Sequence, residues 1–224
     1  MRKLIFTLLS SGFISLAIAQ TPMSPNVLGE PFQGQHFKAK ADNDVEGDPL
    51  VFGDWKKGEV TLKNGEHYPI QKMNLDGQRN RFLYQINDSI YEFQDNIREI
   101  KIYNGDDANS IIVFRNNVDP ESDNFVALLD TGKITIFETY DKKPEGENYS
   151  NGIVNNTRKY VLHTTQYALI NKVANPIKFN SSTLEDLTSD KKKEVEAFVK
   201  ENKLKVKKEP DFLKAINYYN SIGS

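Results

Sequence analysis

Alternating apolar and polar residues between Phe52 and Tyr103 predict a meander of antiparallel strands. Three turn signals separate the alternating runs: Asn64-Gly65, Asp76-Gly77 and Asn87-Asp88. Such dipeptides between alternating runs are strong short-range signals for β-hairpins. We therefore expect the chain to be organised around this meander.

The register of the first hairpin follows from the side chains that it has to bury. A two-residue turn at Asn64-Gly65 would place Val60 opposite Pro69, whereas a three-residue loop over 63–65 places it opposite Tyr68. The three-residue loop needs a left-handed residue at Gly65, which glycine adopts readily. A slip of one residue would turn every side chain to the other face. The sequence predicts the three-residue loop.

The other two turns are predicted by the same reasoning. A three-residue loop over 75–77 pairs Ile70 with Phe82 and Tyr68 with Tyr84, and a two-residue turn at 87–88 pairs Tyr84 with Tyr91 and Phe82 with Phe93. These registers place one set of apolar residues on a single face, which we expect to be core: Val60, Tyr68, Ile70, Phe82, Tyr84, Tyr91 and Phe93. Agreement between turn chemistry and face polarity supports the meander.

Further strands are predicted over 97–103, 111–114, 125–129 and 134–140. The last two form a hairpin around Thr131-Gly132, and both are apolar on both faces, which is typical of a central position. Residues 142–156 are predicted to be a polar surface loop. Residues 158–164 and 166–172 are predicted to form the last hairpin.

The C-terminal segment changes to helical periodicity. Ser182-Thr183-Leu184-Glu185 predicts a capping box that opens a short helical turn, and Ser189 is expected to cap a longer helix with Val195, Phe198 and Val199 on its apolar face. Residues 203–208 form a linker in which Leu204 and Val206 are buried and the lysines are solvated. Pro210 then lies in the first turn of a final helix.

The sequence thus predicts an α+β fold, in which an antiparallel β-meander curls into a barrel or a sandwich and two C-terminal helices cover it. Its expected parts are a signal peptide at 1–19, an extended leader at 20–49, an antiparallel β domain at 50–180 and a helical segment at 181–224. Phe32 and Phe37 are expected to attach the leader to the β domain.

The signal peptide is predicted from a basic start, Met1-Arg2-Lys3, and an apolar stretch that ends in Ala17-Ile18-Ala19. The apolar stretch is too short to span a bilayer, so no membrane-spanning segment is expected after cleavage. The expected localisation is the periplasm or the exterior. Removal of this segment leaves 27 basic and 31 acidic residues, which argues against nucleic acid as a partner.

Candidate chemistry is sparse, and the sequence predicts no catalytic, cofactor-binding or metal-binding residue and no cofactor. The chain has no cysteine, and its three histidines, His36, His67 and His163, are far apart and outside any metal-binding motif. Asp106, Asp107 and Asn109 form an acidic loop, but they lack the spacing of a calcium loop, so a solvated turn is expected. No nucleophile elbow, phosphate loop or dinucleotide fingerprint is present.

Two lysine clusters stand out, 191–193 and 203–208. The first lies at a predicted helix start, where positive charge opposes the helix dipole, and it is interpreted as a solvated face. Attraction to an anionic outer surface stays open as a hypothesis.

The pattern Trp55-x-x-Gly58-x-Val60-x-Leu62-x-x-Gly65-x-x-Tyr68, the β-rich middle and an ending on Tyr218-Tyr219-Asn220 resemble a group of secreted or periplasmic proteins of Bacteroidota with two C-terminal helices. The resemblance covers most of the chain after the signal peptide. It implies an exported setting and carries over no catalytic residue.

These observations favour an exported, non-enzymatic protein that binds or interacts with a component of the envelope, with an envelope protein as a potential partner. Two alternatives remain: a β-barrel that holds a lipid or a sugar, and a hydrolase whose site the sequence does not reveal. An exposed aromatic such as Trp55 beside a groove would favour a sugar as the ligand, and a dry cavity lined by Phe would favour a lipid. A filled core would favour an interaction protein.

Overall fold

The computed structural model describes residues 35–37, 45–94, 96–105, 110–146, 148–150, 153–155 and 158–222. The predicted signal peptide and most of the predicted leader lie outside these residues. Within the leader, Phe37 donates its backbone N–H to the carbonyl of Ile90 at 2.9 Å, and the guanidinium of Arg79 lies over its ring. The expected attachment through Phe37 is therefore present, whereas Phe32 is outside the described residues.

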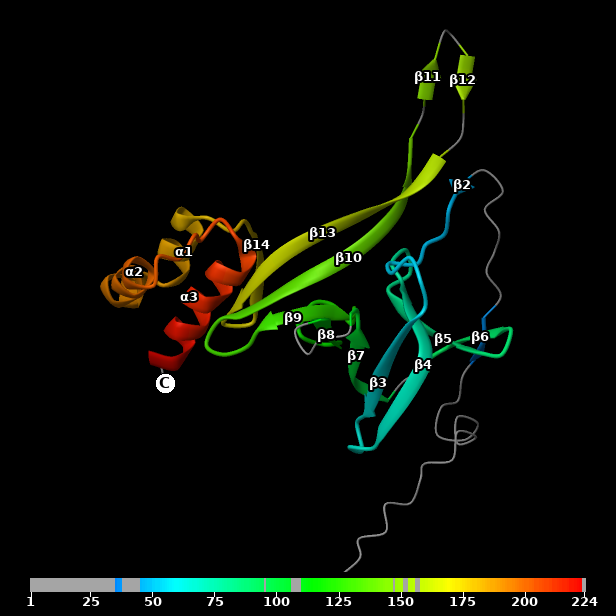
Figure 1. Cartoon of the computed structure of the whole chain (residues 1–224), viewed down its shortest axis with the longest axis horizontal. Coiled ribbons are helices and arrows are strands. Elements are labelled where there is room, and N and C mark those ends of the chain that lie inside the picture. Colours follow the sequence, from blue (N-terminus) through cyan, green and yellow to red (C-terminus); the bar gives the residue numbers. More distant parts are fainter. Residues whose placement is uncertain are drawn as a thin grey trace, which may run out of the picture. The chain divides into compact units, whose positions relative to one another are not determined.

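Twelve strands form one sheet in the order β1-β6-β5-β4-β3-β7-β8-β9-β10-β13-β14, with β2 beside β13 (Figure 1). The strands are β1 (Gln35–His36), β2 (Val45–Glu46), β3 (Lys56–Leu62), β4 (His67–Asp76), β5 (Arg81–Ile86), β6 (Ser89–Glu92), β7 (Ile97–Tyr103), β8 (Ile111–Arg115), β9 (Val126–Asp130), β10 (Thr135–Glu145), β13 (Arg158–Ile170) and β14 (Val173–Ile177). A separate pair consists of β11 (Asn148–Ser150) and β12 (Ile153–Asn155).

The predicted α+β class is confirmed. Of the two predicted arrangements of the sheet, a barrel or a sandwich, the barrel is wrong. The described part of the sheet begins at β1 and ends at β14, and these two strands do not pair with each other. All neighbouring strands are antiparallel except β2 and β13, which are parallel. The sheet is therefore open.

The first and third turns of the meander have the predicted geometry. Val60 pairs with Tyr68, and Gly65 has a φ of 91°, the left-handed conformation that the three-residue loop needs. Tyr84 pairs with Tyr91 across the two-residue turn at Asn87-Asp88. At both positions the residues of the turn are sufficient to determine the register of the hairpin.

The second turn differs from the prediction. Strand β4 continues to Asp76, so that Phe82 pairs with Leu75 instead of Ile70, and Tyr84 pairs with Met73 instead of Tyr68. The reason is the side chain of Asp76, which is buried and accepts the N–H groups of Gln78 and Arg79, both at 3.0 Å. This carboxylate stabilises a four-residue turn that composition alone does not distinguish from a tighter one.

The predicted last hairpin is also wrong, because residues 158–170 form one strand. β13 pairs with β10 over eleven residues without a bulge. Residues 142–145, which were predicted to begin the loop over 142–156, are therefore part of β10. The turn lies instead at Asn171 and Lys172, whose φ angles of 51° and 68° join β13 to β14. Positive φ at both residues is typical of a two-residue hairpin turn.

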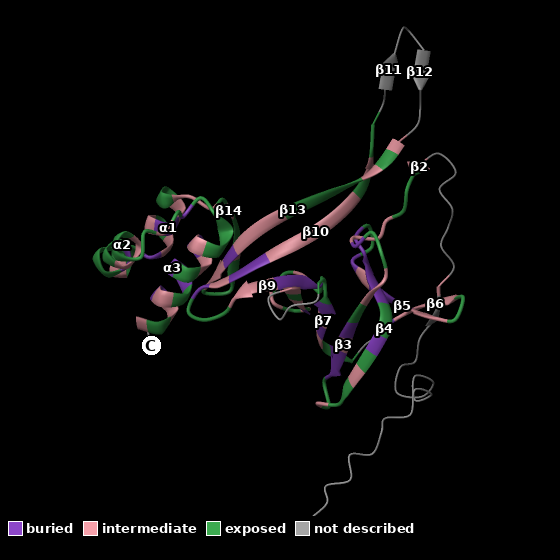
Figure 2. Cartoon of the chain, in the orientation of Figure 1, coloured by how far each residue is buried: buried purple, intermediate pink, exposed green. Residues whose placement is uncertain are grey.

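Aromatic side chains fill the core of the sheet. Figure 2 shows the buried parts of β3, β4 and β9 in purple. The ring of Phe82 makes edge-to-face contacts with Phe114 and Phe125, each at 5.1 Å between centroids, and Phe114 contacts Phe52 at 6.3 Å. Of the seven residues predicted to share a face, Val60, Ile70, Phe82, Tyr84 and Phe93 are buried, and Tyr68 and Tyr91 are partly buried. The prediction that this face is core is confirmed for the buried five.

Three helices follow the sheet: α1 (Ser181–Leu187), α2 (Lys192–Glu201) and α3 (Glu209–Ile222). The sequence predicts two helices and a short helical turn, which is the helix α1, but it misplaces two caps. The side chain of Asn180, not of Ser182, accepts the N–H of Thr183 at 2.9 Å, and Ser189 begins a single 3₁₀ turn instead of capping α2. Pro210 lies in the first turn of α3, as predicted.

The helices bury one end of the sheet in a second core. Ile134 and Ile136 of the β9–β10 hairpin and Ala168 of β13 pack with Leu184, Val195, Val206, Phe212, Ala215, Ile216 and Tyr219. The central position predicted for the hairpin is confirmed by this contact. No described helix is both long and apolar enough to cross a membrane.

Polar contacts fix the helices to the sheet. Asn220 donates to the carbonyl of Ile134 at 2.9 Å and accepts the N–H of the same residue at 3.0 Å. Asp190 accepts the hydroxyl of Tyr219 at 2.8 Å and pairs with Lys133 at 2.6 Å. The β9–β10 turn and α3 are thereby joined through both backbone groups of one residue.

Replacement of Asn220 by Ala should lower the free energy of unfolding by about 1–3 kcal/mol, because it leaves the N–H and C=O of Ile134 without their partner. Ser221→Ala, on the exposed side of the same turn of α3, should change it by less than about 0.5 kcal/mol. Urea unfolding of both variants measures the difference. Equal effects of the two substitutions would show that the contact to Ile134 does not hold the helices.

Candidate functional site

The described histidines do not converge on a common site. His67 in β4 contacts Thr61 at 3.0 Å, and His163 in β13 contacts Glu145 at 2.7 Å. The backbone of His36 lies in β1, and the acidic loop 106–109 lies outside the described residues. In the part of the chain that the structure describes, no three His, Asp or Glu side chains are grouped as metal ligands would be.

The interior of the sheet is occupied at the positions where a ligand-binding barrel would leave space. Phe82 lies between Phe114 and Phe125, and the ring of Tyr140 contacts both Phe52 and Phe114. Burial raises the pKa of the Tyr140 hydroxyl, and the charge of Glu138 adds to this effect. Close aromatic packing of this kind stabilises a core and leaves no room for a bound molecule there.

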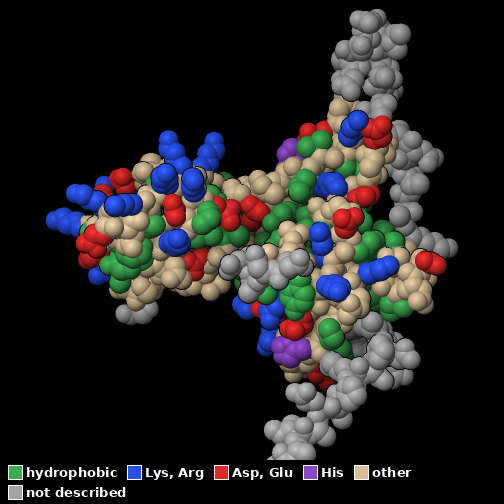
Figure 3. All heavy atoms as spheres, viewed as in Figure 1, with side chains coloured by type: hydrophobic (Ala, Val, Ile, Leu, Met, Phe, Trp, Pro, Cys, Tyr) green, Lys and Arg blue, Asp and Glu red, His purple; other side chains and the backbone are tan. Residues whose placement is uncertain are grey.

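The most unusual surface is the basic segment, residues 191–208, which comprises α2 and the linker before α3. It contains eight lysines and three glutamates, a net charge of +5 in a chain whose formal net charge is −2. Among the described residues, seven of these lysines have no ion pair within 4 Å: Lys191, Lys193, Lys200, Lys203, Lys205, Lys207 and Lys208. Figure 3 shows lysines gathered over this part of the molecule.

The lysines at the start of α2 oppose the local electrostatics. Lys191 is the N-cap residue without a side-chain cap, and Lys192 and Lys193 are the first two helical residues. The N-terminus of a helix carries partial positive charge, so lysines there cost stability. Their position is therefore not explained by the stability of α2.

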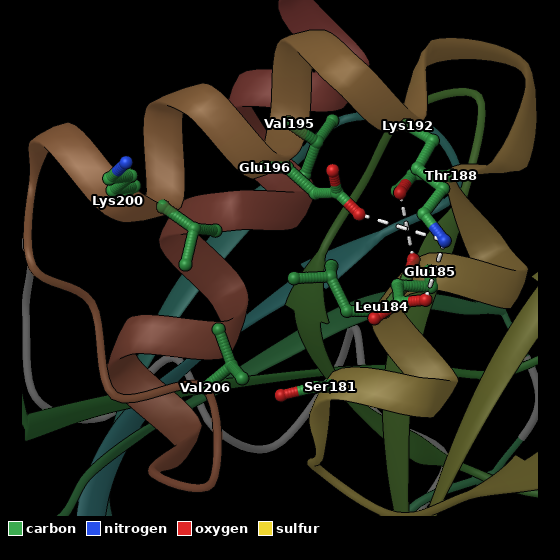
Figure 4. A pocket seen from close by; sticks show the side chains of 10 residues that line it. Ser181, Leu184, Glu185, Thr188, Lys192, Val195, Glu196, Lys200 and Val206 are labelled. Carbon is green, nitrogen blue, oxygen red and sulfur yellow. Dashed lines mark hydrogen bonds and ion pairs between the residues drawn. The ribbon is translucent and has the colours of Figure 1, made fainter.

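A small apolar pocket opens beside the basic segment, between α1, α2 and the linker (Figure 4). Its volume is about 160 Å³, and its floor consists of Leu184, Val195, Val199 and Val206. An apolar cavity of about 150 Å³ is large enough for a benzene-sized group. The pocket therefore has the size of one aromatic ring or a short alkyl group.

Charged side chains surround this floor. Lys192 pairs with Glu185 at 2.7 Å and with Glu196 at 3.6 Å, and Lys200 extends beside them without an ion pair among described residues. The hydrogen bond to Glu185 raises the pKa of Lys192, so the ammonium stays charged. The arrangement is an apolar socket whose rim carries both signs of charge, because two glutamates and two lysines line it.

A second, more open groove lies between β9 and α3, next to the stacked rings of Phe198 and Tyr218. Asp130 lines it. Burial raises the pKa of Asp130, and hydrogen bonds from Thr131, Asn217 and Asn220 offset part of that effect. These donors also fix the β9–β10 turn to α3, so Asp130 has a structural role.

Two carboxylates, Glu138 of β10 and Glu209 at the start of α3, come close enough to influence each other. Burial raises the pKa of Glu209, and the charge of Glu138 adds to the effect. Glu138 already accepts a hydrogen bond from Gln166 at 2.5 Å. No pocket described above includes this pair, and Trp55, which precedes β3, is only half-buried in the sheet region.

Comparison with known proteins adds no relative. No family model, no curated protein and no solved structure matches the chain. Function therefore has to be argued from the geometry alone.

The two lysine clusters that the sequence singles out lie at either end of α2. The prediction that Val206 is buried in the linker is confirmed, and Leu204 packs against the same core. What the sequence does not reveal is the pocket, because its floor combines Leu184 of α1 with residues of α2 and the linker. The one sequence feature near the pocket is Ser189, where one helical pattern gives way to the next, and it predicts a helix cap.

Asp130 should make stability depend on pH. A carboxyl whose pKa is raised by folding stabilises the protein below its ordinary pKa of 3.8, and this contribution is lost as the pH rises through the folded-state pKa. The melting temperature of Asp130→Asn minus that of the natural chain should therefore be more positive at pH 7 than at pH 3. Asp186→Asn, an exposed position on α1, controls for the loss of one charge and should show a smaller difference between the two pH values.

Proposed function

We propose that the protein is an exported, non-enzymatic binding protein of the cell envelope, and that its basic segment attaches it to an anionic lipid surface. The observation that carries the proposal is the set of seven lysines in residues 191–208 that have no ion pair with any described residue, next to an apolar pocket that Lys200 also lines. Export rests on the predicted signal peptide. The proposal extends the interaction hypothesis by naming the surface that interacts.

Electrostatic attraction supplies the main driving force. Each lysine close to an anionic membrane surface contributes about 1 kcal/mol, and the effect decays within a Debye length, about 8 Å at physiological salt. Residues 191–208 carry a net charge of +5, and clusters of about 4–8 basic residues are typical of segments that bind anionic lipids. Seven of the lysines have no ion pair with a described carboxylate, so their charge is available to a partner.

The pocket contributes an apolar component. Its floor is formed by Leu184, Val195 and Val206, all buried. Its rim carries Lys200 and the ion pairs of Lys192 with Glu185 and Glu196. A lipid offers both chemistries at once, since it joins an apolar chain to a negative headgroup. Nucleic acid offers the charge but no alkyl group, and the negative charge of the whole chain argues against it.

The filled sheet core favours this surface over a ligand held inside the sheet. A barrel for lipid or sugar needs an enclosed cavity, whereas the rings of Phe82, Phe114 and Phe125 occupy the core. A glycoside hydrolase would need two carboxylates facing each other across a cleft, and Gln166 already donates a hydrogen bond to Glu138. Neither alternative has an observation that favours it.

Reversal of three charges should weaken lipid binding about a hundredfold or more. The variant Lys193→Glu, Lys200→Glu, Lys203→Glu removes about 3 kcal/mol of attraction, where about 1.4 kcal/mol corresponds to a factor of ten. Binding is measured by sedimentation with phosphatidylcholine vesicles that do or do not contain phosphatidylglycerol. Binding of the natural chain should require phosphatidylglycerol and should decrease with salt.

A matched control carries the same change of net charge at exposed lysines of the meander. The variant Lys57→Glu, Lys63→Glu, Lys72→Glu places this change of charge on β3, β4 and their turn. This variant should bind the anionic vesicles almost as well as the natural chain. Equal loss in both variants, or no binding of the natural chain to phosphatidylglycerol, would rule out the basic segment as the attachment site.

The pocket is tested separately by filling it. Val199→Phe should weaken binding to the anionic vesicles about tenfold, because it displaces about two methylene groups worth about 0.8 kcal/mol each. Ala197→Phe adds the same ring at an exposed position of α2 and should not weaken binding. If the two variants bind alike, the attachment is electrostatic and the pocket takes no part.

A further inference from the structure

A polar pocket lies where the strands of the meander meet the segment between β8 and β9. Its volume is about 260 Å³, and its lining residues lie at or next to the ends of β3, β5, β6, β7, β8 and β9. Small-molecule sites usually have volumes of about 300–1,000 Å³, so this pocket suits a ligand at the small end of that range. None of its lining residues belongs to the basic segment or to a helix.

The backbone around the pocket departs from regular strand geometry. The pairing of β3 with β7 shifts register between Thr61 and Leu62, and such bulges are frequent next to functional sites. Asn80, Asn96 and Asn117 have positive φ angles of 52°, 95° and 54°. Asparagine adopts positive φ more readily than most residues do. These irregular positions lie in or directly beside the lining, and they allow several strand ends to converge there.

The floor of the pocket is apolar and well fixed. Phe93, Ile97 and Phe125 line it, and all three are buried. Asn80 holds Phe125 in place, because its carboxamide donates to the C=O of Phe125 at 3.0 Å and accepts its N–H at 2.6 Å. A cavity of about 150 Å³ holds benzene, so about 260 Å³ has room for an apolar side chain and a polar end.

The wall of the pocket carries both signs of charge in equal number. Lys63 and Arg81 supply two positive charges, and Glu92 and Asp123 supply two negative charges. An anionic ligand would meet the two carboxylates, and a cationic ligand would meet the two basic side chains. A ligand that itself carries one charge of each sign complements this wall, and specificity often depends on such unfavourable pairings for the wrong ligand.

Arg81 is positioned to bind a carboxylate. Its Nη1 atom donates to the C=O of Asn80 at 3.1 Å, which fixes the guanidinium. Its Nε lies 3.9 Å from Glu92 and its Nη2 lies 3.8 Å from Asp123, and both distances are too long for a hydrogen bond. A guanidinium can bind a carboxylate through two parallel N–H···O bonds. The Nε and Nη2 donors are therefore available to a carboxylate of a ligand.

Asp123 is the carboxylate best placed to accept an ammonium group. Its side chain is 78% exposed, and Arg81 is its one charged partner among the described residues. Glu92, in contrast, also pairs with Arg79, so much of its charge is already neutralised. Arg81 and Asp123 are 3.8 Å apart. Two neighbouring groups of opposite charge match a ligand whose carboxylate and ammonium are attached to the same carbon atom.

We propose that this pocket binds a free α-amino acid with an apolar side chain of about the size of leucine or phenylalanine. The carboxylate accepts hydrogen bonds from Nε and Nη2 of Arg81, and the ammonium donates to Asp123. The side chain packs on Phe93, Ile97 and Phe125. This site goes beyond the proposed attachment to lipid and does not depend on it.

Calorimetric titration of the full chain after removal of residues 1–19 tests the proposal, with L-leucine and L-phenylalanine as probes. Both should bind. N-acetyl-L-leucine lacks the ammonium and L-leucinamide lacks the carboxylate, so each should bind about tenfold more weakly or worse than L-leucine, because each loses charge-assisted hydrogen bonds. Glucose provides a polar ligand without charge and should give no heat of binding.

Two substitutions test the residues that hold the charged end. Arg81→Gln and Asp123→Asn should each weaken the binding of L-leucine about tenfold or more. Arg98→Gln and Asp54→Asn make the same changes at exposed positions that do not line the pocket, and they should leave the affinity unchanged. Melting temperatures check that all four variants fold. If Arg81→Gln does not fold, Asp123→Asn decides, because its side chain is the more exposed.

Three outcomes would overturn the proposal. Equal affinity for L-leucine and both of its blocked derivatives would show that the pocket accepts an apolar group without recognising the charges. Binding of glucose without binding of either amino acid would assign the pocket to a neutral ligand. No binding of either amino acid at millimolar concentration would show that the pocket is not an amino-acid site. The variant Lys193→Glu, Lys200→Glu, Lys203→Glu should bind L-leucine normally, so failure of lipid attachment and failure of this site are distinguishable.

Discussion

Three asparagine side chains hold segments of this protein together where no regular strand pairing reaches. Each carboxamide donates to the carbonyl and accepts the N–H of one distant residue, as a neighbouring strand would. The pairs are Asn74 with Phe52, Asn80 with Phe125 and Asn220 with Ile134. A carboxamide has the same donor and acceptor as a peptide group, so it satisfies both backbone groups of its partner without a second strand.

The position of these contacts explains why the sheet can remain open. Asn74 fixes the chain before β3 against β4, and Asn80 fixes the start of β9 against the turn before β5. Both side chains are buried, and buried polar groups are costly unless they are paired. The aromatic core is therefore enclosed by side-chain contacts, whereas a barrel would enclose it by strand closure.

The third contact sets the relation between the sheet and the helices. Asn220 fixes the β9–β10 turn to α3, and the second core then buries the apolar sides of α1 and α3. α2 contributes Val195 to this core and keeps its lysines in solvent. The basic segment therefore lies on the side of α2 that faces away from this core.

Much of the fold follows from the sequence because its determinants are local. Gly65 and Asn87-Asp88 specify their turns, and Pro210 marks the first turn of α3. The lysines of 191–208 and their net charge are also evident from the sequence. The bacterial resemblance and the signal peptide remain predictions.

Only the tertiary structure decided the features that depend on distant partners. Asp76 extends a turn because it is buried, and the alternating pattern of residues 158–170 does not distinguish one long strand from two short ones until β10 pairs with all of it. That the lysines lack carboxylate partners depends on where the other helices place their acidic residues. The sequence determined most strands, the first and third turns of the meander and the charge, whereas long-range contacts determined the remaining register and the pocket, because these depend on residues that meet only after folding.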